Sequence, residues 1–288
     1  MLTIRNLSKT YENGIRALAD VSLDVPKGMF GLLGPNGAGK STLMRTLATL
    51  QEPDTGTVHL DGLDVLSEKE EVRKILGYLP QEFGVYPRFS AEAMLNHFAV
   101  LKGIADGGER KRTVDRLLDI TNLRDVRKQK LGTFSGGMRQ RFGVAQALIG
   151  SPELIIVDEP TAGLDPQERH RFLNLLSEIG ENVVVILSTH IVEDVRELCS
   201  RMAVIDEGRV LMSGDPRTFA SELEGKVWRK SIDKSEVGAY EDSMTVISAR
   251  LLAGRPNIHV LSDEHPGDGF EPVIPDLEDV YMAAIRCA

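Results

Sequence analysis

The sequence has few of the residues that mark a secreted, zinc-binding or nucleic-acid-binding protein. Cysteine occurs only twice, at Cys199 and Cys287, with no Cys-x-x-Cys pair, so neither a disulfide framework nor a zinc site is expected. The 34 basic residues are outnumbered by 43 acidic ones, and the net charge of −9 repels a phosphate backbone. We therefore expect no nucleic-acid partner, and a reducing cytosol fits best.

Long apolar runs are also missing. Runs such as Val183 to Leu187 are far shorter than the roughly 20 residues that span a bilayer. The start, Met1 to Arg5, lacks the apolar stretch of a secretory signal. We expect no transmembrane segment in this chain, so another chain would have to cross the membrane in any membrane process that it serves.

What the sequence does contain is a glycine-rich loop of the kind that binds phosphate. Residues 34–41 read Gly-Pro-Asn-Gly-Ala-Gly-Lys-Ser and match the pattern G-x-x-x-x-G-K-[ST]. The glycines let backbone N–H groups point inward, Lys40 can reach the β and γ phosphates, and the Ser41 hydroxyl can bind Mg²⁺. The alternative is a flexible turn, but a strand-like run at 28–33 and a helix-like run at 42–47 favour a phosphate loop. The residues expected to hold a nucleoside triphosphate are Asn36, Gly37, Ala38, Gly39, Lys40, Ser41 and Thr42.

Hydrophobic periodicity predicts an α/β fold with a mostly parallel sheet. The continuous apolar runs at 154–157 and 183–187 are too short for helices, and strands that are apolar throughout are covered on both faces. Short β-like runs alternate with turns between residues 2 and 86, which predicts a β-rich, antiparallel N-terminal part, with a further strand at 75–79. Together with the phosphate loop, this pattern is typical of a P-loop NTPase core.

The periodicity also divides the chain. Between about 87 and 150 the period changes from two to 3.6, which predicts a helical insertion with Ser90 and Ser135 at the starts of two helices. Composition shifts after residue 216. We therefore expect one large domain at 1–216 and a small C-terminal accessory domain at 217–288, polar and turn-rich, with a helix near its end.

Two adjacent carboxylates follow the apolar run at 154–157. Ligands of open α/β sheets bind at the carboxyl ends of the strands, where this run delivers Asp158 and Glu159. Phosphoryl transfer to water needs a metal and an oriented water, so Asp158 suits the Mg²⁺ shell and Glu159 suits polarising the water. An exposed acidic loop is the alternative, and the phosphate loop in the same chain favours the catalytic interpretation.

With these motifs, residues 2–216 resemble the ATP-binding subunit of an ABC transporter. Further matches follow in the family's order: Tyr11 at the adenine-stacking aromatic, Gln81 at the glutamine joining core to insertion, Ser135-Gly136-Gly137 at the signature, Thr161-Ala162-Gly163-Leu164-Asp165 at the dimer-contact loop and His190 at the switch histidine. The resemblance implies ATP hydrolysis by Glu159, His190, Gln81 and Lys40, and Mg²⁺ binding by Ser41, Gln81 and Asp158. It also implies ATP contacts from Tyr11, Gln81, Ser135, Gly136, Gly137 and Asp165.

Each of these matches also has an ordinary structural alternative. Ser135 and Asp165 can cap helices, Gln81 can be a solvated turn residue, His190 a structural histidine and Tyr11 a common edge-strand residue. The ordered set favours the functional interpretation.

The signature departs from the family's commonest form, Leu-Ser-Gly-Gly-Gln. Phe134 stands for the leucine and Met138 for the glutamine, so one amide is lost from the edge of the ATP site. Ser135 and the two glycines are retained, and inactivity does not follow.

The resemblance also implies partners. Subunits of this family meet head to tail, with each ATP between one chain's phosphate loop and the other's signature helix, so a second copy or a paralogue is expected. A separately encoded transmembrane permease is expected to contact the helical insertion and the region of Gln81. This would place the chain at the cytoplasmic face of the cell membrane.

The C-terminal sequence indicates the direction of transport. Residues 275–281 resemble the Leu-Glu-Asp-Val-aromatic terminus of many bacterial drug-exporter ATPases, which predicts an exporter. One alternative is a soluble ATPase of the same superfamily that acts on ribosomes or DNA, but the chain has a single cassette and an acidic balance. A regulatory module without turnover is a third hypothesis, and the presence of Glu159, Gln81 and His190 argues against it.

Overall fold

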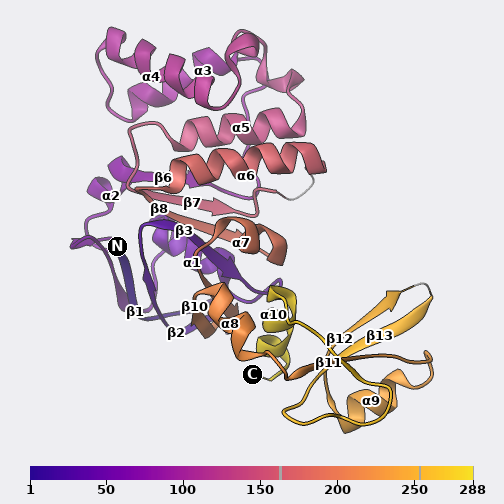
Figure 1. Cartoon of the computed structure of the whole chain (residues 1–288). Coiled ribbons are helices and arrows are strands. Elements are labelled where there is room, and N and C mark those ends of the chain that lie inside the picture. The colour runs from indigo at the N-terminus through magenta and orange to yellow at the C-terminus, as the bar shows by residue number, and fades with distance from the viewer. Residues whose placement is uncertain (162–163, 253, 288) are drawn as a thin grey trace.

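A computed structural model describes residues 1–161, 164–252 and 254–287 of the chain. Three β-sheets and the helices around them make up this part. Figure 1 shows α3 and α4 at one end of the molecule and the sheet that carries β11, β12 and β13 at the other. None of the helices in the described ranges combines the length and hydrophobicity that a bilayer crossing requires.

The central sheet has the strand order β10-β9-β3-β8-β7-β6. Its strands are β3 (Gly28–Leu33), β6 (Leu76–Leu79), β7 (Leu154–Asp158), β8 (Val184–Thr189), β9 (Arg201–Asp206) and β10 (Arg209–Gly214). Every neighbouring pair is parallel except β9 and β10, which form an antiparallel hairpin. The mostly parallel sheet predicted from the apolar runs is therefore confirmed.

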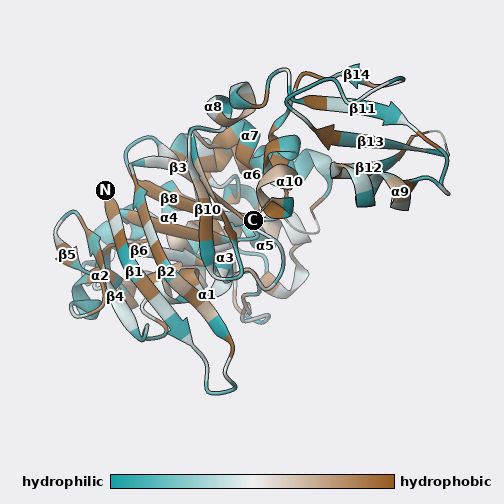
Figure 2. Cartoon of the chain, turned by 90° about the horizontal axis from the view of Figure 1, so that it is seen from below, coloured by the Kyte–Doolittle hydropathy of each residue, from teal (hydrophilic) through white to brown (hydrophobic). Residues whose placement is uncertain are grey.

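Both faces of this sheet are covered, which is why every residue of β7 and β8 is buried. Leu154 and Ile156 face a cluster with α1 (Lys40–Leu47) and the N-terminal strands. Ile155 and Val157 face the opposite cluster, formed with α6 (Pro166–Gly180) and α7 (Val192–Leu198). Figure 2 shows hydrophobic residues along the strands of this sheet.

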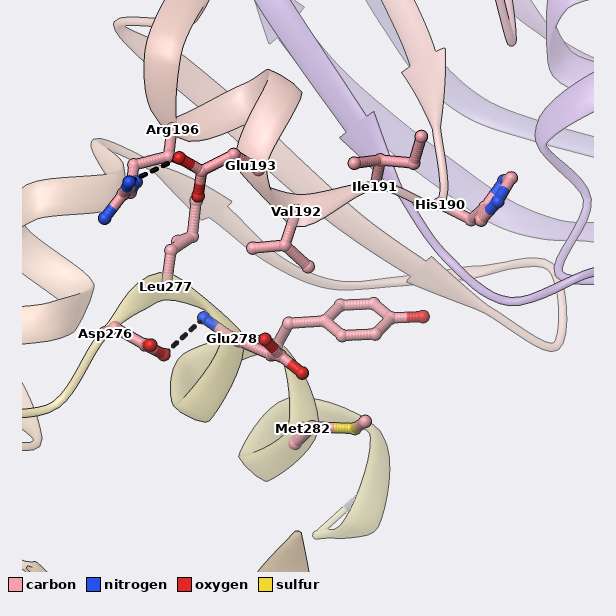
Figure 3. A pocket seen from close by; sticks show the side chains of 10 residues that line it. His190, Ile191, Val192, Glu193, Arg196, Asp276, Leu277, Glu278 and Met282 are labelled. Atoms are coloured by element: carbon pink, nitrogen blue, oxygen red, sulfur yellow. Dashed lines mark hydrogen bonds and ion pairs between the residues drawn. The ribbon is translucent and has the colours of Figure 1, made fainter. Parts of the chain in front are cut away.

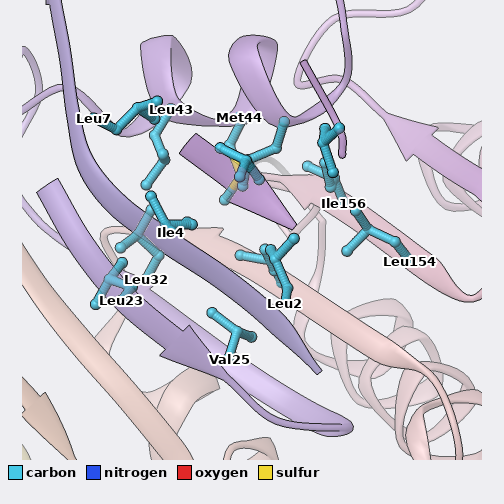
Figure 4. Close-up of a cluster of buried hydrophobic side chains, with 14 of the residues drawn as sticks. Leu2, Ile4, Leu7, Leu23, Val25, Leu32, Leu43, Met44, Leu154 and Ile156 are labelled. Carbon is cyan, nitrogen blue, oxygen red and sulfur yellow. The ribbon is translucent and has the colours of Figure 1, made fainter. Parts of the chain in front are cut away.

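A second, antiparallel sheet lies against α1 and has the order β2-β1-β4-β5. It contains β1 (Leu2–Thr10), β2 (Arg16–Val25), β4 (Thr55–Leu60) and β5 (Leu63–Asp64). In Figure 4, Leu2, Ile4 and Leu7 of β1 pack with Leu43 and Met44 of α1. Full burial of one such side chain stabilises the fold by about 1.5–3 kcal/mol, so this cluster holds the helix that follows the phosphate loop.

The helical insertion contains α3 (Ala91–Leu101), α4 (Gly107–Ile120) and α5 (Gly136–Ala147), with short 3₁₀ turns at Arg124–Val126 and Leu131–Thr133. Ser90 caps α3, accepting a hydrogen bond from the Ala93 amide at 3.2 Å. The preceding segment differs from the expected strand at 75–79, because Ile75 ends a helix, α2 (Lys69–Ile75), and β6 begins at Leu76. The charged residues of α2 carried no strong periodic signal, so the helix was not anticipated.

The C-terminal part contains more β-structure than the expected turn-rich tail. After α8 (Pro216–Glu222), a sheet of order β12-β13-β11-β14 forms from β11 (Val227–Ser231), β12 (Thr245–Leu252), β13 (Arg255–Leu261) and β14 (Glu271–Pro272), with α9 (Val237–Ser243) beside β12. In β13 only alternate residues, such as Ile258 and Val260, are buried, so no continuous apolar run marked it.

The last helix, α10 (Leu277–Arg286), packs back onto the large domain. It lies beside α7 and α8 in Figure 1, and it contacts both helices. Leu277 and Val280 are buried in the cluster that covers one face of the central sheet. The helix expected near the end of the tail therefore connects the tail to the sheet that carries the site.

Candidate active site

Four neighbouring parallel strands end at one edge of the central sheet, and several of the predicted site residues follow these ends. Leu33 of β3 is paired with Thr189 of β8, and Asp158 of β7 is paired with Ser188 of β8. Strand β6 lies on the other side of β7 and leads to Gln81. Because the carboxyl ends of parallel strands lie at the same edge of a sheet, this edge carries the phosphate loop, His190, Glu159 and Gln81.

The phosphate loop connects β3 to α1 in a tight backbone path. Gly37 and Gly39 have positive φ values of 86° and 105°, a conformation that glycine adopts without strain. A Cβ on Gly39 would lie 2.4 Å from the Ala17 carbonyl oxygen, so this position also needs glycine for space. The loop precedes the first turn of α1, where free backbone N–H groups favour an anion.

Lys40 is 5% exposed and lies within this loop. Its Nζ donates to the carbonyl oxygens of Gly34 at 2.7 Å and Pro35 at 3.0 Å. Burial lowers the pKa of the Lys40 ammonium, while the carboxylates of Glu159 and Asp158 oppose this shift. The ammonium is thus held where a phosphate entering the loop would meet it.

Three polar side chains converge on the Glu159 carboxylate. Gln81 Nε2 donates to Glu159 Oε2 at 3.2 Å, and His190 Nδ1 lies 3.3 Å from the same oxygen. Lys40 Nζ lies 4.0 Å from Glu159 Oε1. The structure therefore brings together the four residues that the sequence marked as catalytic.

The backbone of Glu159 is unusual. Its φ is 47°, in the left-handed region that few residues other than glycine adopt, and its amide donates to the Ser188 carbonyl at 2.9 Å. This turn places the carboxylate, 11% exposed, beside the phosphate loop. Such backbone strain persists only where surrounding contacts hold it, and it is common at active sites.

Asp158 has the environment of a metal ligand. It is 5% exposed, and its Oδ1 has no hydrogen-bond partner among the described residues. Burial raises the pKa of the Asp158 carboxyl and the Glu159 charge adds to the rise, whereas Lys40 opposes it. A buried carboxylate oxygen without a partner among the described residues, near the Ser41 hydroxyl in the first turn of α1, fits a Mg²⁺ ion bound together with nucleotide phosphates.

Tyr11 lies directly after β1 and next to α1. Its hydroxyl is 3.1 Å from Thr42 Oγ1 and donates to Gln51 Oε1 at 3.3 Å. Thr42 is part of the expected nucleotide site, so these contacts place the tyrosine ring at the edge of the phosphate-loop region.

The signature residues lie elsewhere, at the start of α5. Ser135 caps this helix, accepting from the Met138 amide at 3.2 Å, and no described hydrogen bond or ion pair joins it to the phosphate loop. A Cβ on Gly137 would lie 2.3 Å from Glu168 Oε2 of α6, so a larger residue here would require the Glu168 side chain to move. Phe134 and Met138, the departures from the family signature, pack into the core of the helical insertion.

Asp165 is likewise separate from the phosphate loop. It caps α6, accepting from the Glu168 amide at 2.9 Å. Ala162 and Gly163 of the expected dimer-contact loop lie outside the described residues. The capping roles foreseen for Ser135 and Asp165 are thus both present, and neither excludes a contact with nucleotide.

A buried ionic group near the site was not foreseen. Asp194 is 0% exposed and accepts hydrogen bonds from Thr161 Oγ1 at 2.6 Å and from Arg169 Nε at 2.7 Å. Its one sequence signal is a carboxylate four residues after His190, and charged residues are common at the start of a helix.

Comparison with known proteins identifies the family. The model of the ABC transporter family matches residues 18–162. The chain belongs to the ABC transporter family. YxlF of Bacillus subtilis (strain 168), an uncharacterized ABC transporter ATP-binding protein, is 30% identical and covers 99% of this chain and 100% of its own length. DrrA of Streptomyces peucetius, a daunorubicin/doxorubicin resistance ATP-binding protein, is 36% identical over 90% of this chain and 77% of its own.

Solved ABC cassettes have the same fold. The ATP-binding cassette MJ0796, in a dimeric post-hydrolysis state bound to ADP and Pi, superposes with a TM-score of 0.67 and 28% sequence identity. The match covers 75% of this chain and 98% of that cassette. The present chain is an ATP-binding, ATP-hydrolysing subunit of an ABC transporter, built on a P-loop NTPase core.

Proposed function

We propose that this subunit powers a separately encoded membrane permease and drives export. The observation that carries the proposal is the convergence of Lys40, Gln81 and His190 on Glu159 at the edge of the sheet. Export is supported by the likeness to the drug-resistance protein DrrA, which extends over 90% of the chain and thus into the C-terminal part. The Leu277–Tyr281 sequence supports the same direction.

Within this site each residue has a distinct proposed role. Glu159 polarises the attacking water, while Gln81 and His190 orient that carboxylate and the γ-phosphate. Lys40 and the backbone amides of the loop hold the phosphates, and Tyr11 stacks on the adenine. Ser41, Gln81 and Asp158 would hold Mg²⁺, which would neutralise charge on the phosphate groups of the nucleotide.

A head-to-tail dimer completes the site in this proposal. Ser135, Gly136, Gly137 and Asp165 have no described bond to the phosphate loop of their own chain. The N-terminus of α5 has free backbone N–H groups and a partial positive charge, which suit the phosphates of an ATP held by a second subunit. That subunit is a second copy or a paralogue. The dimeric state of MJ0796 supports this arrangement.

The proposed permease contact lies between α3 and the core. A hollow of about 380 Å³ there is lined by residues of both parts, among them Leu50, Tyr78, Phe98 and Leu101. Leu50 and Leu101 are 61% and 69% exposed, an apolar pair that water disfavours. Docking here would place the chain at the cytoplasmic face of the membrane.

We also propose the division into a cassette at 1–216 and an accessory unit at 217–288.

The contact can be tested with one charge substitution. Leu101→Glu places a carboxylate at an exposed apolar position of the hollow, whose lining also includes Arg73 and Lys102, but leaves the phosphate loop untouched. We expect the variant to hydrolyse ATP alone but to lose co-purification with its proposed permease. Leu251→Glu is the matched control, because Leu251 is 63% exposed on β12 of the C-terminal sheet. Unchanged co-purification of Leu101→Glu would contradict docking at this hollow.

The direction of transport needs a separate measurement. Inside-out membrane vesicles that contain both chains should accumulate daunorubicin when ATP is added outside. Vesicles with Lys40→Ala, which cannot hold the phosphates, serve as the control. ATP-dependent release of preloaded drug from the same vesicles would contradict export.

A further inference from the structure

Asp194 is a buried carboxylate outside the residues assigned above. It lies in the first turn of α7, which begins directly after the switch segment at His190. Figure 3 shows Glu193 and Arg196 of the same helix among the side chains that line a hollow toward α10. This hollow has a volume of about 390 Å³. Asp194 is not among the residues that line this hollow, and its contacts are instead with α6, the loop after β7 and the end of β8.

Both oxygens of Asp194 have partners. Oδ2 accepts from Thr161 Oγ1 at 2.6 Å and from Thr189 Oγ1 at 3.4 Å. Oδ1 accepts from Arg169 Nε at 2.7 Å, and Arg169 supplies the compensating charge. Thr189 Oγ1 in turn accepts from the Ile191 amide at 2.9 Å. A buried carboxylate with this set of partners fixes the segments that carry them.

Two of these segments carry catalytic side chains. Thr161 follows Glu159 by two residues, and Thr189 immediately precedes His190. Glu159 Oε2 and His190 Nδ1 are only 3.3 Å apart. Glu159 also has the strained φ of 47°, which must be held by surrounding contacts. The Asp194 carboxylate thus accepts hydrogen bonds from residues close in sequence to both Glu159 and His190.

We propose that Asp194 is a positioning residue for ATP hydrolysis, which keeps Glu159 and His190 in register by binding Thr161 and Thr189. This inference rests on the proposed roles of Glu159 and His190. Asp194 is not proposed to contact the nucleotide or the attacking water. Loss of its carboxylate should therefore lower the rate by changing the positions of Glu159 and His190. Misplacement by about 1 Å can lower a rate by about 100-fold.

The main test is Asp194→Asn, which keeps the size of the side chain and removes its charge. We expect kcat for ATP hydrolysis to fall by about 10- to 100-fold, because the pair is no longer held in place. The KM for ATP should change by less than about threefold, since the phosphate loop is untouched and only transition-state interactions are lost. Glu193→Gln is the matched control, because this half-buried neighbour pairs with Arg196 and faces the hollow toward α10. Its kcat should equal that of the wild type.

A double-mutant cycle separates positioning from a purely structural role. Thr161→Val removes only the hydroxyl that binds Asp194, so the kcat losses of this variant and of Asp194→Asn should overlap in the double variant rather than multiply. If Asp194→Asn does not fold, Thr161→Val and Thr189→Val decide the question, with an expected kcat loss of more than about fivefold in at least one.

Three outcomes would overturn the inference. They are a wild-type kcat in folded Asp194→Asn, a wild-type kcat in both threonine variants, or losses that multiply in the double variant. Glu159→Gln is assayed alongside, so that the catalytic role of Glu159 and the positioning role of Asp194 are tested separately. Wild-type turnover of Glu159→Gln removes the proposed catalytic role, whereas low turnover of Glu159→Gln with an unaffected Asp194→Asn removes the positioning role alone.

Discussion

Glu159 differs from every other carboxylate of the site in what surrounds it. Asp158, its neighbour in the chain, is buried, its Oδ1 has no hydrogen-bond partner within the described part of the chain, and its pKa is raised, which suits a cation. Glu159 is instead turned by its left-handed backbone toward an amide, an imidazole and an ammonium. Two adjacent carboxylates therefore have different chemistry because of their local environments.

This difference leads to a prediction for Glu159→Gln. The amide keeps the shape of the side chain but cannot polarise water as a base, so kcat should fall by about 10²–10⁴-fold. ATP should still bind, because Lys40 and the loop are unchanged. The measurements are steady-state hydrolysis and the mass in solution at saturating ATP, where we expect a trapped dimer. Glu153→Gln, at the exposed opposite end of β7, is the control.

Wild-type turnover of Glu159→Gln would contradict the role of this residue. A monomer at saturating ATP would contradict the shared site while leaving the role in hydrolysis intact. The two measurements therefore test separate parts of the proposal.

At the scale of elements, the start of α5 has two functions to satisfy. Ser135 caps the helix through a 3.2 Å hydrogen bond, and the same N-terminus is proposed to face the phosphates of a partner's ATP. Ser90 caps α3 with a bond of the same length and has no proposed nucleotide contact. Both serines therefore cap a helix, but only Ser135 is proposed to face phosphate, so Ser90 is a matched control for the capping role.

We predict that Ser135→Ala and Ser90→Ala each lower the free energy of unfolding by about 0.5–2 kcal/mol. Ser135→Asp should retain the cap but place a negative charge against phosphate, so the ATP-trapped dimer of Glu159→Gln should be lost. Ser90→Asp should leave that dimer intact. Urea unfolding and light scattering measure the two effects, and an unimpaired dimer of Ser135→Asp would exclude the phosphate role.

Elements differ in how well local sequence predicted them. The strands β7 and β8 were predicted because their residues are apolar throughout, and α6 was predicted because Asp165 and Pro166 mark its start. The helix α2 and the C-terminal sheet were missed. In α2 only Val72 is buried, so its hydrophobic pattern is too sparse to show a period. In the C-terminal sheet β13 buries alternate residues and β12 only three in a row, so neither strand forms a long apolar run.

At the scale of the whole molecule, α10 links the C-terminal sheet to the ATPase core. Its apolar face is buried in the cluster that covers one face of the central sheet, while Asp279 contacts His259 and Glu278 forms an ion pair with Arg250 of the C-terminal sheet. Asp279 Oδ1 lies 2.7 Å from His259 Nδ1. Burial alone would raise the pKa of the Asp279 carboxyl, but the hydrogen bonds from His259 and the Asp276 amide hold it below its ordinary value.

The lowered pKa predicts how this link depends on pH. A carboxyl with a depressed folded-state pKa stabilises the fold above its unfolded pKa, about 3.9, and loses that contribution as pH falls through the folded value. Asp279→Asn should therefore be less stable than the wild type at pH 6, and the difference should shrink below about pH 4. Urea unfolding across this range measures it. Asp263→Asn, an exposed control in the same part of the chain, should show no such trend.

The sequence by itself determined what lies close together along the chain. The phosphate loop, the Asp158–Glu159 pair and the caps at Ser135 and Asp165 each depend on a few consecutive residues, so their chemistry is visible without a fold. Only the tertiary structure decided that Gln81, Glu159 and His190 meet, and that Asp194 lies behind them. Those contacts depend on strand order and on the burial of both faces of the sheet, which no local period encodes.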